Sequence, residues 1–403
     1  MRCLRRLPLG LRPARARAYS SQASEIVVNE IRRQISSVAD DAPACLSTAA
    51  WSPTAEELRK ELRMSRMAVS PFEGFGHVDP FILVGSEIEN LDVGVRGLVQ
   101  SDNALLTAAA KYFFEGDSGK KFRATMVLLT AKACSGEILP SQTRLAEIVE
   151  MIHTASLFHD DVIDMASTRR GRASANAAFG DKVAILAGDF LLSRACVGLA
   201  RLRNLDVIEL ISTVIEHLVR GEIMQMRPAV EQPISADVGD PVLEAYLAKN
   251  FYKTGSLMAN SCRAAAMLAE HNTDTCDAAF RFGRHVGLAF QLVDDVLDFE
   301  GSEASLGKPA LADLRQGIVT APTLLAAHEV PELRPLIARK FCQPGDVDAA
   351  LDMVKNSNGV ERARELAYLQ AELAAEAVLR GLPPSDARSA LVTLASKVVT
   401  RRH

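Results

Sequence analysis

The chain has 403 residues, of which 48% are hydrophobic and 24% are charged, and its net charge at neutral pH is −4. A chain of this length and apolar content can bury a large core. It has no run of 18 apolar residues, so the sequence predicts no membrane-spanning helix. The seven cysteines are scattered singly, without C-x-x-C or Cys/His metal-ligand spacing, and we expect them to be reduced and mostly packed.

The first 24 residues differ from all that follow. They contain six arginines and no acid before Glu25. This composition is typical of an organellar transit peptide, with the mitochondrion as the expected destination and the plastid as the alternative. Removing these six charges from −4 leaves about −10, which argues against a nucleic-acid partner. We expect a transit peptide at 1–24, a flexible segment at 25–79 and one large domain at 80–403.

From Pro80 onward, the apolar pattern predicts helices almost throughout and no alternating strand pattern. The expected helices span 81–99, 102–116, 120–134, 142–164, 181–202, 204–226, 242–270, 273–300, 319–328, 346–355, 358–380 and 384–402. One all-α domain fits this pattern.

Two aspartate clusters of identical spacing lie in apolar helical stretches. The first is Asp160, Asp161 and Asp164, and the second is Asp294, Asp295 and Asp298. Like charges at i, i+4 repel on a helix, so three acids in one turn do not serve stability. Hard oxygen ligands on two helices suit Mg²⁺ that bridges a diphosphate. A solvated acidic face is the alternative for one cluster, but two matched copies favour a metal site.

Basic residues that suit phosphate oxygens are spread along the same chain. Each alone would be an ordinary surface residue, and their combination with the acids predicts a diphosphate-handling site. They are Lys120 and Arg123 in Gly119–Arg123, Arg169 and Arg170 after the first cluster, Lys253 beside Thr254, and Lys308 ten residues after Asp298.

On these motifs, the chain resembles the trans-polyprenyl diphosphate synthases, most closely the long-chain organellar solanesyl (nonaprenyl) or decaprenyl kind. The resemblance covers roughly residues 80–403. It departs from the family at Ala124, where proline is common, and in the polar loop 227–241, which looks like an insertion. The motifs that carry it are Gly119–Arg123, Glu147–His153 running into His159–Asp161, Leu186–Leu191, Tyr252–Thr254, Phe290–Asp295 and Leu306–Pro309.

The resemblance implies an all-α antiparallel helical bundle around a deep central cavity, with the two aspartate helices facing each other across its mouth. It implies prenyl transfer from an allylic diphosphate to isopentenyl diphosphate, with Mg²⁺, replaceable by Mn²⁺, held by Asp160, Asp164 and Asp294. Asp161, Asp295 and Asp298 complete the expected catalytic acids. By the same resemblance, isopentenyl diphosphate is expected to be bound by Lys120, Arg123, His153 and Arg170. The allylic diphosphate is expected to be bound by Arg169, Lys253, Thr254, Gln291 and Lys308.

Product length is expected to depend on the helix that precedes Asp160. Ser156 and Ala155 lie four and five positions upstream, and Ile152 lies eight upstream. A bulky side chain at either of the first two would close the cavity about 6–8 Å below the acids, given the 1.5 Å rise per residue. Small residues there predict an open cavity and a product of about nine or ten isoprene units. Close helix packing is the alternative reason for small residues.

Other residues and functions remain open from sequence. His159 points about 100° away from Asp160 and is expected to pack or to support the site. Gln225 and Asp189 either contribute to the site or brace the bundle, and Arg401 and Arg402 either cap the cavity or are solvated. The alternative functions are a shorter-chain geranyl or geranylgeranyl diphosphate synthase, a subunit of a heteromeric synthase, a terpene cyclase and a helical scaffold. The resemblance further implies a homodimer, with a second subunit and peripheral membrane contact for product release as additional expectations.

Overall fold

The computed structural model describes residues 70–73, 78–112, 114, 121–169, 171–226, 241–300 and 311–401. All of them belong to one compact unit, residues 51–403. The first half comprises α3 Pro80–Leu83, α4 Gly85–Leu98, α5 Ala104–Tyr112, α6 Phe122–Ser135, α7 Pro140–Ile163, β1 Thr168–Arg169, β2 Arg172–Ala173, α8 Ala175–Phe179, α9 Asp181–Arg201 and α10 Leu205–Met226. The second half comprises α11 Pro241–Asn250, the π-helix η3 Phe251–Gly255, α12 Ser256–Met267, α13 Thr273–Glu300, α15 Ala312–Arg315, α16 Ala321–Glu329, α17 Leu333–Ala338, α18 Asp346–Lys355, α19 Gly359–Gly381 and α20 Asp386–Thr400.

The all-α prediction is confirmed, with one small exception. Strands β1 and β2 form a two-stranded antiparallel ribbon in which Thr168 pairs with Ala173 and Arg169 with Arg172. Gly171 lies in the connecting turn with φ of 74°, a left-handed conformation that glycine adopts without steric cost. The sequence did not reveal the ribbon because two residues per strand are too few to show alternation.

Several predicted helix boundaries are corrected. The helix expected at 81–99 is interrupted at Val84, which has φ of −122° and ψ of 23°. The helix expected at 242–270 is three elements, with η3 between α11 and α12. The short helices α8, α15 and α17 were not predicted, because fewer than two turns carry little periodic signal. The predicted transit peptide at 1–24 lies outside the described residues, and so does all of the flexible segment at 25–79 except 70–73 and 78–79.

Helix α7, which carries the first aspartate cluster, is fixed at its start by a glutamine. Pro140 occupies the first turn, where its missing N–H has no partner to lose. The Gln142 side chain accepts from the Leu139 N–H at 2.7 Å and donates to the carbonyl of Ala265 in α12 at 2.8 Å. Since Gln142 is buried, these bonds fix the position of α7 against α12.

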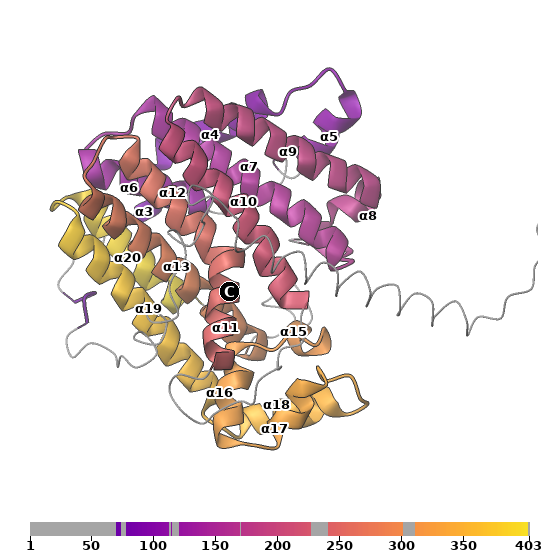
Figure 1. Ribbon diagram of the computed structural model, residues 1–403. Helices are drawn as coiled ribbons and strands as arrows, with labels where there is room; N and C mark the ends of the chain where they lie inside the picture. Colours follow the sequence, from indigo (N-terminus) through magenta and orange to yellow (C-terminus); the bar gives the residue numbers. More distant parts are fainter. Residues whose placement is uncertain are drawn as a thin grey trace, which may run out of the picture. The chain divides into compact units, whose positions relative to one another are not determined.

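Helix α13, which carries the second cluster, packs against α12, η3 and α19, and α19 and α20 lie along it (Figure 1). Two glycines allow α13 to approach α12 closely. A Cβ at Gly283 would lie 2.5 Å from the Met258 carbonyl oxygen, and one at Gly287 would lie 2.5 Å from Cα of Gly255. Larger residues at these positions would push the second aspartate cluster away from η3.

Helix α9 is the one helix in the described ranges that is long and apolar enough to cross a membrane by length and composition alone, a property that packed helices of soluble proteins share. Its inner face packs against α7, α5 and α8. Its outer face carries exposed apolar residues, with Leu186 58% exposed.

Candidate active site

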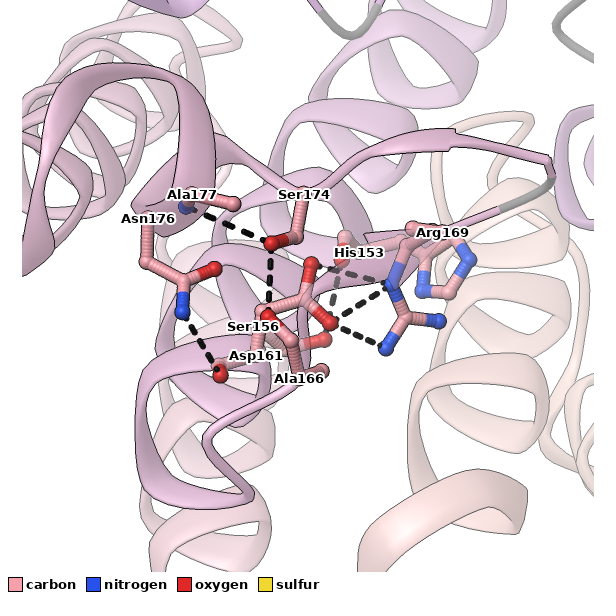
Figure 2. Close-up of polar contacts among 8 residues, drawn as sticks. All are labelled: His153, Ser156, Asp161, Ala166, Arg169, Ser174, Asn176 and Ala177. Atoms are coloured by element: carbon pink, nitrogen blue, oxygen red, sulfur yellow. Dashed lines mark hydrogen bonds and ion pairs between the residues drawn. The ribbon is translucent and has the colours of Figure 1, made fainter.

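The first aspartate cluster lies at the end of α7, and its side chains have different neighbours. Asp161 is buried, and Arg169 on β1 donates to its two oxygens from Nε at 2.8 and 3.0 Å and from Nη2 at 2.6 Å. Figure 2 shows the two side chains facing each other. A bidentate pair of this kind fixes the orientation of the guanidinium. Asp161, which the sequence grouped with the catalytic acids, therefore holds Arg169 in this structure.

The loop after the cluster is fixed by serine and asparagine bonds. Ser174 caps α8 and donates from Oγ to the Ala166 carbonyl at 2.6 Å, and Asn176 donates from Nδ2 to the backbone oxygen of Asp161 at 3.3 Å (Figure 2). These contacts connect the β1–β2 ribbon to the end of α7. They position the strand that carries Arg169 next to the aspartate cluster through polar contacts.

Asp160 and Asp164 lie in an electrostatically unfavourable setting for carboxylates. Burial raises the pKa of Asp160 to about 6, and Lys253 lowers it less than burial raises it. Burial also raises the pKa of Asp164, and the nearby carboxylate of Glu222 raises both. Burial disfavours the charged form of both carboxylates, and the neighbouring acids add a smaller repulsion, so a bound cation would stabilise both groups in their charged form.

Lys253 is held beside this cluster by two residues of α10. Its ammonium lies 2.6 Å from Oε2 of Glu222 and donates to Oε1 of Gln225 at 3.1 Å. Lys253 belongs to η3, and the wider turn of a π-helix changes which face its side chain occupies. Sequence reasoning missed Glu222. The spacing of three between Glu222 and Gln225, which places both on one helical face, was the available signal.

In the second cluster, Asp295 is buried inside a hydrogen-bond network. The Tyr246 hydroxyl and the Ala321 N–H donate to its Oδ2, the latter at 3.3 Å. Gln291 donates from Nε2 to Oδ1 at 3.0 Å, and Thr254 donates to Oε1 of Gln291 at 3.2 Å. Burial raises the pKa of Asp295, while these donors lower it. Thr254 and Gln291, both expected at the allylic diphosphate, are thus in contact with each other, and Tyr246 is a partner the sequence did not reveal.

The other two acids of this cluster differ in exposure. Asp298 is buried, and its Oδ2 accepts from the backbone N–H of Asp313 at 3.3 Å. Asp294 is the most accessible, and its Oδ1 accepts from Nη2 of Arg401 at 2.6 Å. Arg401 therefore lies on the site, which the sequence left undecided between capping and solvation.

The predicted isopentenyl diphosphate residues are only partly within the described ranges. Arg123 on α6 donates from Nη1 to Nε2 of His153 on α7 at 3.0 Å, so these two are brought together. The backbone N–H of Ala124 donates to Oε1 of Glu150 at 3.1 Å, a bond that proline could not make. This bond gives a structural role to the backbone N–H that a residue other than proline provides at that position. Lys120, Arg170 and Lys308 lie outside the described residues.

The three predicted product-length residues line one stretch of α7. Ile152 and Ala155 are fully buried, and Ser156 is half-buried with its Oγ donating to the His153 carbonyl at 2.9 Å. His159 points elsewhere, as expected. Its Nε2 lies 3.5 Å from Oδ1 of Asp189 and 3.3 Å from the Ile185 carbonyl, which joins α7 to α9.

Among the described residues, no three His, Cys, Asp or Glu side chains are close enough together to form a ready metal cage. The donors present nevertheless suit a hard divalent cation. Asp160 and Asp164 are carboxylates one turn apart whose pKa values are raised, and a dication beside them would favour their charged forms.

The all-α bundle brings together carboxylates, a lysine and arginines fixed by ion pairs, all in partly buried surroundings. This combination is typical of an enzyme that acts on charged phosphate groups. The polyprenyl synthetase family model matches residues 103–354. The chain belongs to the polyprenyl synthetase family and is a prenyltransferase.

Individual relatives agree with this assignment. The chain is 46% identical over 346 residues to "Solanesyl-diphosphate synthase 1, mitochondrial" of Oryza sativa, covering 80% of this chain and 79% of that protein. The apo form of an Arabidopsis medium/long-chain length prenyl pyrophosphate synthase is 42% identical, with a TM-score of 0.64 over 81% of this chain and 100% of the other. A Caulobacter crescentus polyprenyl synthase complexed with calcium and isoprenyl diphosphate is 30% identical, with a TM-score of 0.70 over 80% and 97%.

Proposed function

We propose that this protein elongates an allylic diphosphate with successive isopentenyl diphosphate units to a long-chain all-trans-polyprenyl diphosphate that supplies a quinone side chain. The relatives, which include a solanesyl-diphosphate synthase, support both the reaction class and the long product. The chain is mitochondrial, in line with the rice relative, and residues 1–24 are proposed as its transit peptide. The domain at 80–403 carries the reaction.

The observation that carries this proposal is the arrangement around Asp160. Asp160 and Asp164, at the end of α7, share their surroundings with Lys253, and Asp161 holds Arg169 at 2.6 Å, near enough for its charge to lower the pKa of both acids. Acids and bases in this arrangement suit a diphosphate that is bound partly through a dication and partly directly.

We assign the leaving diphosphate to Arg169 and Lys253, with Lys308 from the sequence. Departure of the diphosphate leaves positive charge on the allylic carbon and adds negative charge to the leaving oxygens. Mg²⁺ held by Asp160, Asp164 and Asp294, or Mn²⁺ in its place, would supply charge neutralisation of that diphosphate. Thr254 and Gln291 are hydrogen-bonded to each other at 3.2 Å, and Gln291 also contacts Asp295 of the second cluster. In this scheme both residues contact the allylic diphosphate.

Arg123 and His153 are proposed to hold the diphosphate of isopentenyl diphosphate, together with Lys120 and Arg170. The double bond of isopentenyl diphosphate attacks the allylic carbon, a carbon–carbon bond forms, and a proton leaves the adjacent carbon. The departed pyrophosphate accepts that proton, so no protein base is required. The Arg123–His153 contact at 3.0 Å supports this grouping, because it brings the two side chains together.

One incubation tests the proposal. The purified protein, isopentenyl diphosphate, farnesyl diphosphate and Mg²⁺ are combined, and the dephosphorylated products are sized by chromatography. We expect products of about nine or ten isoprene units, in keeping with the open cavity that the small residues Ala155 and Ser156 predict below Asp160. Products that stop at three or four units would contradict the long-chain assignment, and absence of any product from the single chain would point to a missing second subunit.

A further inference from the structure

A cavity lies beside the candidate site and is not used in the proposed reaction. It encloses about 250 Å³ between the end of α10, α11, the segment from Gly317 to Val319, and α16. Most of its wall is apolar, with Met224, Val242, Ile318 and Leu324 contributing. Binding pockets for organic ligands usually measure about 300–1,000 Å³, so this one suits a small molecule.

Two lysines face this apolar space. Lys249, on the last turn of α11, lies deep enough that burial lowers the pKa of its ammonium. Its Nζ lies 5.2 Å from the centre of the Tyr246 ring, and it forms no ion pair with a carboxylate within the described ranges. Asp295, Asp313 and Glu222 attract it from farther away, and Lys253 repels it. Lys340 contributes a second ammonium, 3.5 Å from the Met226 carbonyl.

Two residues of the cavity wall also contact the candidate site. Tyr246 donates its hydroxyl to Asp295, and Gln225 accepts from Lys253 at 3.1 Å. A ligand in the cavity would therefore touch the side chains that hold one acid of the second cluster and the lysine beside the first. None of the described residues assigned above to the two diphosphates lines the cavity, but two of its wall residues contact the site.

We propose that this cavity binds a short prenyl diphosphate, with the diphosphate on Lys249 and Lys340 and the five- or ten-carbon tail against the apolar wall. A buried ammonium without an anion is costly, and a bound diphosphate removes that cost. The apolar wall and the small volume select a short tail over an inorganic anion or a long chain. The choice of ligand rests on the proposed function.

The test is a chemical footprint of the full chain. The protein is held in chelator without isopentenyl diphosphate, so that no condensation occurs, and trace acetylation of each lysine is measured by peptide mass spectrometry. Saturating geranyl diphosphate should lower the acetylation rate of Lys249 at least about fivefold, which corresponds to most sites being occupied, and should also protect Lys340. The exposed lysines Lys182 and Lys355 serve as internal controls and should not change.

Further arms identify the ligand. Inorganic pyrophosphate should need at least about tenfold higher concentration for the same protection, and geraniol should give none, because the apolar wall and the lysines both contribute. Equal protection by pyrophosphate would overturn the prenyl assignment. Protection of Lys253 without Lys249 would place the ligand in the predicted allylic position and overturn the cavity site.

A variant gives an independent measurement. Lys249→Met should lower the retention of geranyl diphosphate in equilibrium dialysis with chelator, whereas Lys182→Met, which removes the same charge from the surface, should not. Equal retention by both variants would refute the proposal. A protein that makes polyprenyl diphosphate but fails these tests refutes the cavity site alone, and one that passes them but makes no product refutes the proposed function alone.

Discussion

Arg401, in the last described position of the chain, binds Asp294 of the second aspartate cluster. Its Nη2 lies 2.6 Å from Oδ1 of Asp294 and 2.7 Å from the Phe290 carbonyl, and its guanidinium stacks 3.9 Å from the centre of the Phe290 ring. A residue more than a hundred positions away in sequence thus occupies the oxygen that we assign to metal binding.

Arg401→Gln should lower the Mg²⁺ concentration needed for half-maximal turnover severalfold, because the guanidinium and the cation compete for one carboxylate. The matched control is Lys397→Gln, which removes a charge from the same helical end but breaks only an exposed contact with Asp79 at 3.1 Å. An unchanged or higher Mg²⁺ requirement in Arg401→Gln would show that the arginine does not compete.

Asp160→Ala or Asp294→Ala should each reduce turnover by several orders of magnitude while leaving the helical circular dichroism intact, because the lost carboxylate acts in the transition state. Asp352→Asn, at an exposed position on α18, is the control. Retention of more than about a tenth of the activity, a loss below ~1.4 kcal/mol, would count against the metal-ligand assignment. Chelator should also abolish activity, and Mg²⁺ or Mn²⁺ should restore it.

Ala155→Phe should shorten the product to about three or four isoprene units while the first condensation persists, because the ring would close the predicted cavity about 7.5 Å below Asp160. Since Ala155 is fully buried, the larger side chain also risks unfolding the protein. Ser156→Phe, at a half-buried position, is the second variant, and thermal melting checks both. A folded variant that makes full-length product, or that loses all activity, contradicts the idea of a cavity floor.

His285 on α13 makes stability depend on pH. It is buried, its Nδ1 lies 2.8 Å from Oε1 of Gln370, and burial lowers its pKa from 6.5 to about 3. As pH falls below 6.5, the unfolded chain takes up a proton that the folded chain refuses, so the free energy of unfolding decreases by up to about 1.4 kcal/mol per pH unit until about pH 3.

The measurement compares denaturant unfolding of the native protein and His285→Gln at about pH 7.5 and about pH 5. Because glutamine cannot take up the proton, the variant should lose less stability between the two conditions than the native protein. The difference between the two proteins isolates the histidine from the titrating carboxylates. Equal losses would show that His285 contributes nothing to the pH dependence.

The predicted homodimer can be tested at the exposed apolar residues of α9 and α10. The exposed large apolar residues concentrate on α9 and α10, which contact each other, and include Leu186 and Val219 at 58% and 61% exposed. Such a concentration is typical of an association surface. Leu186→Glu or Val219→Glu should convert a dimer into a monomer by light scattering. Val93→Glu, at a 72% exposed position on α4, is the control and should leave the mass unchanged. A native protein that is already monomeric would refute the prediction.

The sequence by itself determined the helical class and the positions of both aspartate clusters, because each is a local pattern that repeats at helical spacing. The resemblance also put Thr254 with Gln291, and Arg123 with His153, in common diphosphate-binding groups, and the structure showed that each pair is in contact. The locations of the long helices α7, α9, α10 and α13 followed from periodicity over many turns. Short helices and the two-residue strands did not, because they have too few residues for a period.

Only the tertiary structure decided which acid does what. Asp161 and Asp295 have the same residue type as their neighbours, yet Asp161 binds Arg169 and Asp295 accepts from Tyr246 and Gln291. Glu222 on α10 and Arg401 at the end of α20 come to the site from elsewhere in the chain. Their roles depend on which side chains packing brings within hydrogen-bond distance and on how far each charge is removed from water, and neither quantity is encoded in any short stretch of sequence.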